Sequence, residues 1–309
     1  MSLRALITGA NGFVGRQLGA HLAARGWEVV RTDFGDVDEV IACDISDPGQ
    51  VRAMLDQAGP ISHVFHLAAL TFVPEASRKP ESAMSVNYGG TVNLVRTLSE
   101  RDMAARFLYV SSSGVYGVPE RVPVTEADPL RPANPYSISK AAADFYCQYA
   151  ARAGELDIVR LRPFNHTGPG QSGQFVLPSF ARQIAQIEAG AREPVLHVGN
   201  LDAARDFLHV DDVVRAYELA AVQARPAEAY NVCSGTAYKI ADALEQLRAL
   251  SPVEIEVRTD PERLRPADVP EMRGDHGKLT TETGWKPQVR FEQLLEELLG
   301  YWRAQETEA

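Results

Sequence analysis

A glycine-rich turn close to the start of the chain constrains the fold more than any other feature of the sequence. An apolar run at residues 3–8 is followed by GANGFVG at residues 9–15 and then by a helical pattern that reaches residue 25. Glycine lets a backbone approach a pyrophosphate closely, and the free N–H groups that begin a helix favour its negative charge. This order predicts a dinucleotide site, the alternative being a tight turn without a ligand. The expected contacts are Gly9, Asn11, Gly12, Phe13, Val14 and Gly15.

Short apolar runs alternate with amphipathic stretches through the first half of the chain. This alternation is typical of a parallel sheet covered by helices. Asn134 before Pro135 is expected to begin the longest helix, and Gly154 to end it as a left-handed cap. The predicted strands are 3–8, 28–32, 63–67, 106–110 and 157–161, and the predicted helices are 12–25, 48–58, 81–101 and 135–152.

The regular alternation stops after Pro163, where Gly, Pro, Gln and Asn become frequent. A helix at 211–223 and a strand at 230–232 are predicted to return to the first lobe. The sequence thus predicts an α/β fold, a Rossmann-type doubly wound parallel sheet with a smaller, mostly helical C-terminal lobe. The predicted domains are 1–165 with about 210–235 for the dinucleotide, and 166–209 with 236–309 for the substrate.

Charge and cysteine content argue against several other classes of protein. The net charge of -10 disfavours a nucleic-acid partner. No apolar stretch has the length of a membrane span, and the run at 3–7 lacks the basic start of a secretory signal. Cys43, Cys147 and Cys233 are too widely spaced for a disulfide framework or a zinc site. We expect a cytoplasmic protein with reduced thiols and no metal.

The second predicted strand is followed by Asp33, whose carboxylate suits the adenosine ribose of a dinucleotide. A carboxylate there accepts hydrogen bonds from the ribose hydroxyls and repels a 2′-phosphate. Asp33 therefore predicts a preference for NAD(H), while the nearby Arg31 leaves NADP(H) possible. The alternative is that Asp33 is a solvated turn residue.

Tyr136 and Lys140 lie one turn apart near the start of the predicted helix 135–152, so their side chains share a face. A phenol titrates near pH ~10 in water and is a poor acid–base group at neutrality. A neighbouring ammonium is expected to lower the pKa of Tyr136 and make it usable for proton transfer. Lys140 is also expected to bond the nicotinamide ribose. The spacing alone is common, and it gains weight from the glycine turn.

Three serines follow the predicted strand 106–110. The carboxyl end of a strand is where ligands bind in open α/β sheets, so Ser112 is expected to bond the reacting oxygen beside Tyr136. The alternative is a polar strand end that satisfies its own backbone. Asn87 is a candidate for structural or water-relay support, and Tyr116 is predicted to pack.

These motifs, with HLAA at residues 66–69, resemble as a set the extended short-chain dehydrogenase/reductases that act on nucleotide sugars. The match follows the family's order over nearly the whole chain. The resemblance implies that Ser112, Tyr136 and Lys140 are catalytic. It also implies a homodimer in which helices 81–101 and 135–152 pair across a two-fold axis as a four-helix bundle, although these faces could instead pack inside one chain. Further implied cofactor contacts are Asp44 at the adenine, Ile45, Leu67, Ala68, Ala69, Asn87 and Arg162.

The second lobe resembles that of the GDP-4-keto-6-deoxy-mannose reductases within this family. The resemblance rests on RPFNHTGPGQ at 162–171, VGNL at 198–201, RDF at 205–207 and RPADVP at 265–270. A guanidinium can give paired hydrogen bonds to phosphate oxygens, so Arg205 and Arg265 suit a diphosphate, although both could be plain surface arginines. The implied substrate contacts are Ser112, Ser113, Asn165, Val176, Asn200, Arg205 and Arg265.

The residues after Ser112 separate the activities of the family. In its sugar 4,6-dehydratases the catalytic threonine is followed by Asp or Ser and then by Glu, which serve the elimination. Here Ser113 and Gly114 stand at these places, and glycine supplies no base for the sugar C5 proton. The resemblance thus implies reduction of the C4 ketone of GDP-4-keto-6-deoxy-D-mannose by NAD(P)H, with a proton from Tyr136, to GDP-6-deoxy-D-mannose (GDP-D-rhamnose).

Two alternatives to the reductase stay open. A UDP-hexose 4-epimerase would use the same serine, tyrosine and lysine with a retained NAD. A non-catalytic dinucleotide sensor is more remote, because Tyr136 and Lys140 are both present. The sequence does not decide the base of the nucleotide or the stereochemistry at C4.

Overall fold

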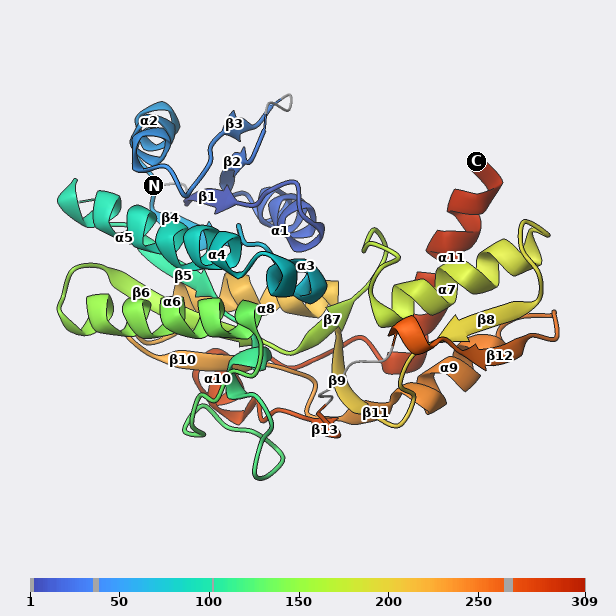
Figure 1. The fold of residues 1–309 in the computed structure, drawn as a ribbon. Helices are drawn as coiled ribbons and strands as arrows, with labels where there is room; N and C mark the ends of the chain where they lie inside the picture. Colours follow the sequence, from blue (N-terminus) through green and yellow to red (C-terminus); the bar gives the residue numbers. More distant parts are fainter. Residues whose placement is uncertain (1–2, 36–38, 102, 264–268, 309) are drawn as a thin grey trace.

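The computed structural model describes residues 3–35, 39–101, 103–263 and 269–308 of the chain. A seven-stranded sheet forms the larger lobe, and every neighbouring pair of its strands is parallel (Figure 1). The Rossmann-type α/β prediction is therefore confirmed. In spatial order the strands are β10 (Ala229–Val232), β6 (Asp157–Pro163), β5 (Arg106–Val110), β4 (His63–His66), β1 (Arg4–Thr8), β2 (Glu28–Asp33) and β3 (Ile41–Ala42).

Both faces of the sheet are buried, because successive residues of each strand enter opposite cores. Ile7 and Phe65 pack with helices α1 (Phe13–Ala24) and α8 (Val210–Gln223). Their neighbours Leu6 and Val64 pack with helices on the other face, α2 (Pro48–Ala58), α5 (Gly90–Glu100) and α6 (Pro135–Arg152). The near-continuous apolar strands of the sequence are explained by this double burial.

Helix α6 begins and ends where the sequence predicts. The side chain of Asn134 accepts a hydrogen bond from the amide of Ser137 at 2.9 Å, and Pro135 follows in the first turn. Gly154 follows the helix with φ +74°, a left-handed conformation that glycine adopts without strain. These two signals fix the position of Tyr136 at the start of the helix.

The helix predicted at 81–101 is present, but it contains a π-helical turn that the sequence did not indicate. A short helix α4 (Pro80–Ala83) leads into a π-helical turn η1 (Met84–Gly89) and then into α5. A methyl group added to Gly90 would lie 2.6 Å from the side chain of Ile45, so the chain passes very close to the segment after β3. The preceding helix α3 (Val73–Arg78) has no counterpart in the prediction.

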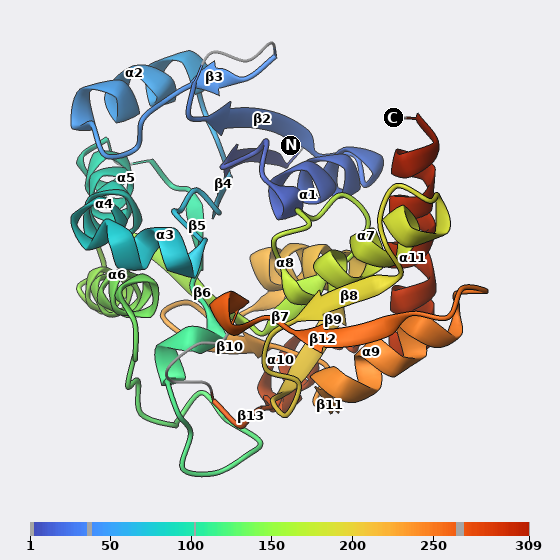
Figure 2. The same ribbon diagram turned by 45° about the vertical axis from the view of Figure 1, so that its right-hand side comes forward.

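The smaller lobe follows the carboxyl end of β6 and contains more strand than its sequence pattern indicates (Figure 2). Its strands have two to six residues, which is too short for a recognisable alternation. Its helices are α7 (Val176–Glu188), α9 (Ile240–Ala249) and α11 (Phe291–Glu308), with a short turn η3 (Pro261–Arg263). Helix α10 (Gly277–Thr283) packs instead in the core of the larger lobe, beside α8 and β10. Its strands are β7 (Asn165–Thr167), β8 (Val195–Val198), β9 (Ala204–His209), β11 (Ala237–Lys239), β12 (Glu256–Thr259) and β13 (Glu271–Met272).

The described part of the chain has no helix that is both long and apolar enough to cross a membrane. The same residues hold no group of three or more His, Cys, Asp or Glu side chains suited to a metal ion. All three cysteines are buried free thiols.

Candidate active site

The glycine turn between β1 and α1 approaches its surroundings so closely that a side chain would not fit. A methyl group on Gly15 would lie 2.2 Å from the carbonyl oxygen of Gly9. One on Gly9, where φ is +69°, would lie 2.8 Å from the amide nitrogen of Ala68. Both neighbours are backbone atoms that cannot move aside. The turn is therefore shaped for close backbone approach, as a bound pyrophosphate requires.

Helix α1 begins without a side chain that caps its first turn. Its N-cap is Gly12, and no side chain bonds the first amides. The first turns of α2 and α6, by contrast, are capped by Asp47 and Asn134. Uncapped amides at the positive end of a helix dipole suit a phosphate anion, so this helix start fits the predicted dinucleotide.

Asp33 lies beside the glycine turn, at the end of β2. Its carboxylate accepts hydrogen bonds from the backbone amides of Asn11 at 2.6 Å and Phe34 at 2.7 Å. Arg31 donates to the side chain of Asn11 at 2.8 Å, and Arg16 donates to its carbonyl oxygen. One carboxylate and two guanidinium groups thus surround Asn11, where the adenosine ribose is expected.

The other predicted cofactor residues follow the carboxyl ends of neighbouring strands. The segment after β4 is tied to the end of β1, because the backbone amide of Ala68 donates a hydrogen bond to the hydroxyl of Thr8 at 3.2 Å. These residues therefore border one edge of the sheet, the edge at which open α/β sheets bind ligands. They are Leu67, Ala68 and Ala69 after β4, and Asp44 and Ile45 after β3.

Ser112 and Tyr136 lie on two elements that are in contact. Ser112 caps the short 3-10 helix η2 (Ser113–Tyr116), where its hydroxyl accepts a hydrogen bond from the amide of Gly114 at 3.1 Å. A methyl group on Gly114 would lie 2.7 Å from the hydroxyl of Ser137, the residue after Tyr136, and 3.4 Å from that of Ser112. The hydroxyl of Ser112 also acts on the phenol of Tyr136, since it lowers the pKa of that phenol against the effect of burial. The predicted serine–tyrosine pair is thus brought together.

Burial shifts the pKa values of both ionisable residues of the predicted pair. It raises the pKa of the Tyr136 phenol, against the hydrogen bond from Ser112. It lowers the pKa of Lys140 to about 8. The Lys140 ammonium donates to the carbonyl oxygen of Val110 and lies 4.7 Å from the ring centre of Tyr109. Burial thus dominates the pKa of Tyr136, and the lowering of that pKa by Lys140 stays a prediction.

The side chains of two predicted cofactor residues form hydrogen bonds to other groups inside the protein. Asn87 accepts a hydrogen bond from the amide of Leu70 at 2.7 Å, and donates to its carbonyl oxygen at 3.1 Å and to the hydroxyl of Ser139 at 2.9 Å. Arg162 is 4 % exposed, and its guanidinium bonds Asp144. These contacts give both side chains a role in holding neighbouring elements, which for Asn87 is the structural alternative of the prediction. The cofactor contacts of Asn87 and Arg162 stay predictions.

His66 is a residue near the site that the sequence did not assign to a role. It is buried, with Nδ1 2.8 Å from the hydroxyl of Thr8 and Nε2 2.9 Å from that of Thr91. Burial lowers its pKa to about 3, so the ring is neutral. It joins the end of β1, just before the glycine turn, to α5. Both ring nitrogens are thus occupied by structural hydrogen bonds, which explain the residue without a metal or a catalytic base.

The predicted substrate residues of the second lobe lie on different elements. Asn165 on β7 pairs in register with Phe207 on β9, the strand that carries Arg205. Arg205 donates to the carbonyl oxygen of Val269 at 2.6 Å. Asn200 accepts a hydrogen bond from the amide of Asp202 at 3.0 Å, and Val176 is the first residue of α7. Arg265 lies outside the described residues.

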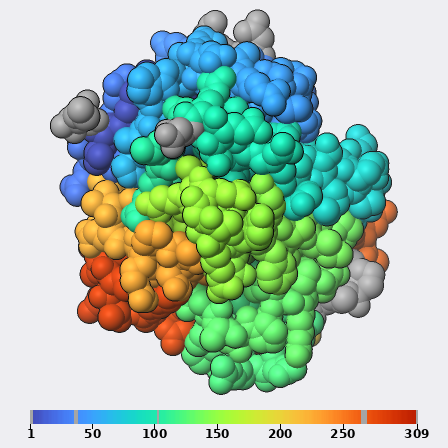
Figure 3. Space-filling view, turned by 90° about the vertical axis from the view of Figure 1, so that its left-hand side faces the viewer, coloured from blue at the N-terminus to red at the C-terminus, as the bar shows by residue number. Residues whose placement is uncertain are grey.

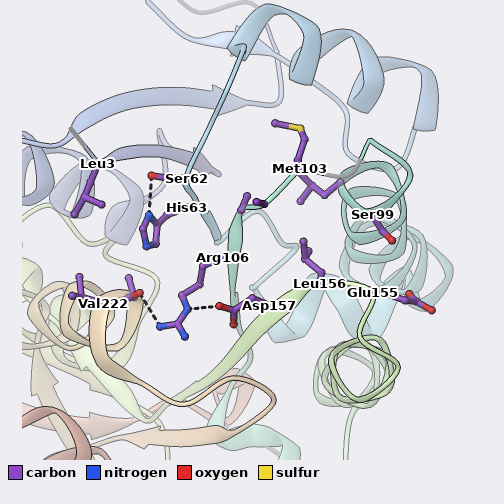
Figure 4. Close-up of a pocket in the computed structure, with 14 residues that line it drawn as sticks. Leu3, Ser62, His63, Ser99, Met103, Arg106, Glu155, Leu156, Asp157 and Val222 are labelled. Atoms are coloured by element: carbon purple, nitrogen blue, oxygen red, sulfur yellow. Dashed lines mark hydrogen bonds and ion pairs between the residues drawn. The ribbon is translucent and has the colours of Figure 1, made fainter. Parts of the chain in front are cut away.

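A cavity of about 710 Å³ lies at the opposite edge of the sheet (Figure 4). Its lining includes His63, Arg106 and Asp157, the first residues of β4, β5 and β6. Arg106 is paired there with Asp157 at 2.9 Å. Because this is the amino edge of the strands, the cavity is remote from Ser112 and is not the predicted site.

Comparison with known proteins agrees with this arrangement. A family model described as GDP-mannose 4,6 dehydratase matches residues 6–298. The chain belongs to this family of extended short-chain dehydrogenase/reductases. It is 38% identical over 307 residues to the GDP-6-deoxy-D-mannose reductase of Pseudomonas aeruginosa, covering 98% of both chains.

Two solved structures extend the comparison. RMD from Pseudomonas aeruginosa, complexed with NADPH, has a TM-score of 0.90 at 37% identity, covering 98% of this chain and 100% of that chain. The UDP-glucose 4-epimerase of Thermus thermophilus, complexed with NAD, has a TM-score of 0.86 at 28% identity, covering 97% and 99%. This dehydrogenase/reductase is thus an NAD(P)-dependent oxidoreductase of the nucleotide-sugar class.

The glycine turn makes a prediction that two substitutions on α1 can test. Gly15→Ala forces a backbone clash at the turn and is expected to weaken NADH and NADPH binding by about tenfold or more. Gly19→Ala is the matched control, because its methyl group meets only the side chain of Ile7 at 3.8 Å. Its dissociation constants, measured by cofactor fluorescence, should stay within about twofold of wild type. Equal binding by both variants would contradict the placement of the cofactor.

Proposed function

We propose that this protein reduces the C4 ketone of GDP-4-keto-6-deoxy-D-mannose to GDP-6-deoxy-D-mannose (GDP-D-rhamnose). One observation carries the choice among the family's activities. Gly114 packs so tightly against Ser137 that a glutamate at this place would have to displace the Ser137 side chain. The position from which a dehydratase would take the sugar C5 proton holds glycine and therefore no base. The likeness to a GDP-6-deoxy-D-mannose reductase supports the same choice.

In this proposal NAD(P)H supplies the hydride when it is bound at the glycine turn. Tyr136, whose phenol is protonated at neutral pH, gives the proton to the sugar O4. Ser112 hydrogen-bonds the same oxygen and orients the ketone. Lys140, whose ammonium is buried at the base of the site, supplies positive charge as the proton leaves the phenol.

The second lobe supplies the proposed contacts to the nucleotide. Arg205 and Asn165 stand on the paired strands β9 and β7, and a guanidinium with an amide donor suits a diphosphate. Val176 and Asn200 border the sugar and the nucleoside in the same proposal, and Ser113 contacts the sugar beside Ser112. Arg265 is proposed as a second diphosphate ligand from its sequence motif.

A 4-epimerase is the second candidate, because the structure also resembles a UDP-glucose 4-epimerase over nearly its whole length. An epimerase retains its cofactor and returns it to the starting state after each turnover. A reductase consumes one reduced cofactor for each product. Cofactor stoichiometry therefore separates the two activities.

The purified protein, incubated with GDP-4-keto-6-deoxy-mannose and NADH or NADPH, is expected to oxidise one cofactor for each 6-deoxy sugar formed. Tyr136→Phe should lower kcat by about 10²-fold or more, since loss of a positioned acid removes this much. The measurement follows cofactor absorbance together with the sugar product.

Wild-type protein that oxidises no cofactor but interconverts a UDP-hexose would establish the epimerase instead. Conversion of GDP-mannose to the 4-keto-6-deoxy sugar without a second enzyme would contradict the conclusion that this protein, with Ser113 and Gly114 at these places, is not a dehydratase. A fully active Tyr136→Phe variant would remove the tyrosine from the mechanism and leave the fold unaffected.

We propose that NADH is the preferred cofactor and that NADPH is also used. Asp33 favours the free ribose hydroxyls, while Arg31 beside Asn11 can pair with a 2′-phosphate. Arg31→Ala is expected to lower kcat/KM for NADPH by about tenfold, the value of one charge-assisted hydrogen bond, and to leave that for NADH within about twofold. Wild-type kcat/KM values that favour NADPH more than tenfold would contradict the role of Asp33.

We propose that two copies associate through α5 and α6, which lie uncovered on one face of the molecule (Figure 3). Ile138, Phe145 and Tyr149 expose apolar surface along α6, at spacings that place them on one side of the helix. An isologous pairing of this face would bury them in a four-helix bundle.

Phe145→Glu is expected to convert this dimer to a monomer, because it buries two unpaired charges at the two-fold interface. Val222→Glu is the matched control, since Val222 on α8 is 55% exposed and Phe145 54%. Sedimentation velocity should show a smaller particle for the first variant alone. A wild-type monomer, or a Phe145→Glu dimer, would contradict this interface.

A further inference from the structure

The two elements that carry the proposed catalytic residues are joined by one buried guanidinium. Arg162 on β6 donates from Nε and Nη2 to the carboxylate of Asp144 on α6, both at 3.0 Å. Its Nη1 donates at 3.0 Å to the hydroxyl of Tyr116, the last residue of η2. Helix α6 carries Tyr136 and Lys140, and η2 is capped by Ser112. Arg162 therefore bonds both elements at once.

The hydroxyl of Tyr116 is held on a second side as well. It donates to the side-chain oxygen of Asn231 on β10 at 2.7 Å, and the amide of Asn231 donates to the carbonyl oxygen of Val124 at 3.0 Å. The ring lies with its centre 5.2 Å from the Arg162 guanidinium. Both side chains are almost completely buried. The phenol of Tyr116 is thus fixed by a donor and an acceptor, so η2 has little freedom to move relative to β6.

Asp144 is the residue through which Arg162 bonds helix α6. It has no exposed surface and also accepts a hydrogen bond from Arg160 at 2.8 Å. Asp144 lies one helical turn after Lys140, which lies one turn after Tyr136. A displacement of Asp144 along α6 would therefore be passed to the pair, because the helix moves as a rigid element.

We propose that Arg162 and Tyr116 are positioning residues that set the distance between the hydroxyls of Ser112 and Tyr136. This inference rests on the proposed function of these two hydroxyls, which must reach the same substrate oxygen. Neither Arg162 nor Tyr116 contacts the substrate in this assignment. A misplacement near 1 Å can lower a rate by about 10²-fold, so a hydrogen bond that holds two elements in register has a measurable effect on kcat.

Tyr116→Phe tests the inference with little disturbance, because it keeps the ring against Arg162 and removes only the hydroxyl. It is expected to lower kcat about tenfold, while KM for the sugar and for the cofactor stays within about twofold. Tyr230→Phe is the matched control. It removes a phenol hydroxyl on β10 of the same sheet, where the hydroxyl accepts from the amide of Arg225 at 2.9 Å and bonds Glu282, away from Ser112.

Both variants are expected to melt about 2–6 °C below wild type, since each loses hydrogen bonds of similar kind. Only Tyr116→Phe should lose kcat. A kcat for Tyr116→Phe within twofold of wild type, or an equal loss in Tyr230→Phe, would overturn the positioning role. Wild-type protein without reductase activity, or an active Tyr136→Phe variant, would instead mark failure of the proposed function.

Discussion

Asp144 is a carboxylate with no exposed surface, and the arrangement of the larger lobe depends on the two arginines that neutralise it. Burial acts to raise the pKa of Asp144, but hydrogen bonds and charge from Arg162 and Arg160 outweigh it and hold the pKa below its usual range. A charge at this depth is stable only with such partners, and removing one partner is far more costly than losing a surface pair. Helix α6 is consequently held in one position on β6.

At the proposed active site, burial shifts the pKa values of the ionisable residues more than ion pairs do. The Tyr136 phenol is kept protonated, and Lys140 is held by Val110 and Tyr109 at its base. Asp144 opposes the effect of burial on the pKa of Lys140. A protonated phenol beside a buried ammonium suits the delivery of a proton to a ketone oxygen.

The parts of the fold that could be predicted are those with local signals. The glycine turn, the strands of the sheet and the cap at Asn134 all have a cause within a few residues of sequence. The π-helical turn at Met84–Gly89 could not be predicted, because it depends on tertiary contacts such as those of Asn87 with Leu70 and Ser139. The short strands of the second lobe could not be predicted for a related reason, since they pair with partners far along the chain.

The sequence by itself determined the α/β class, the glycine turn and the identity of the serine, tyrosine and lysine, because each follows from residue type and short spacing. Only the tertiary structure decided the state of these groups and the role of Arg162. From its motif Arg162 was expected to bind the cofactor, whereas in the fold it is buried between Asp144 and Tyr116. The physical reason is that burial and charge neutralisation arise between β6, α6 and η2, and no one segment contains the information on how they meet.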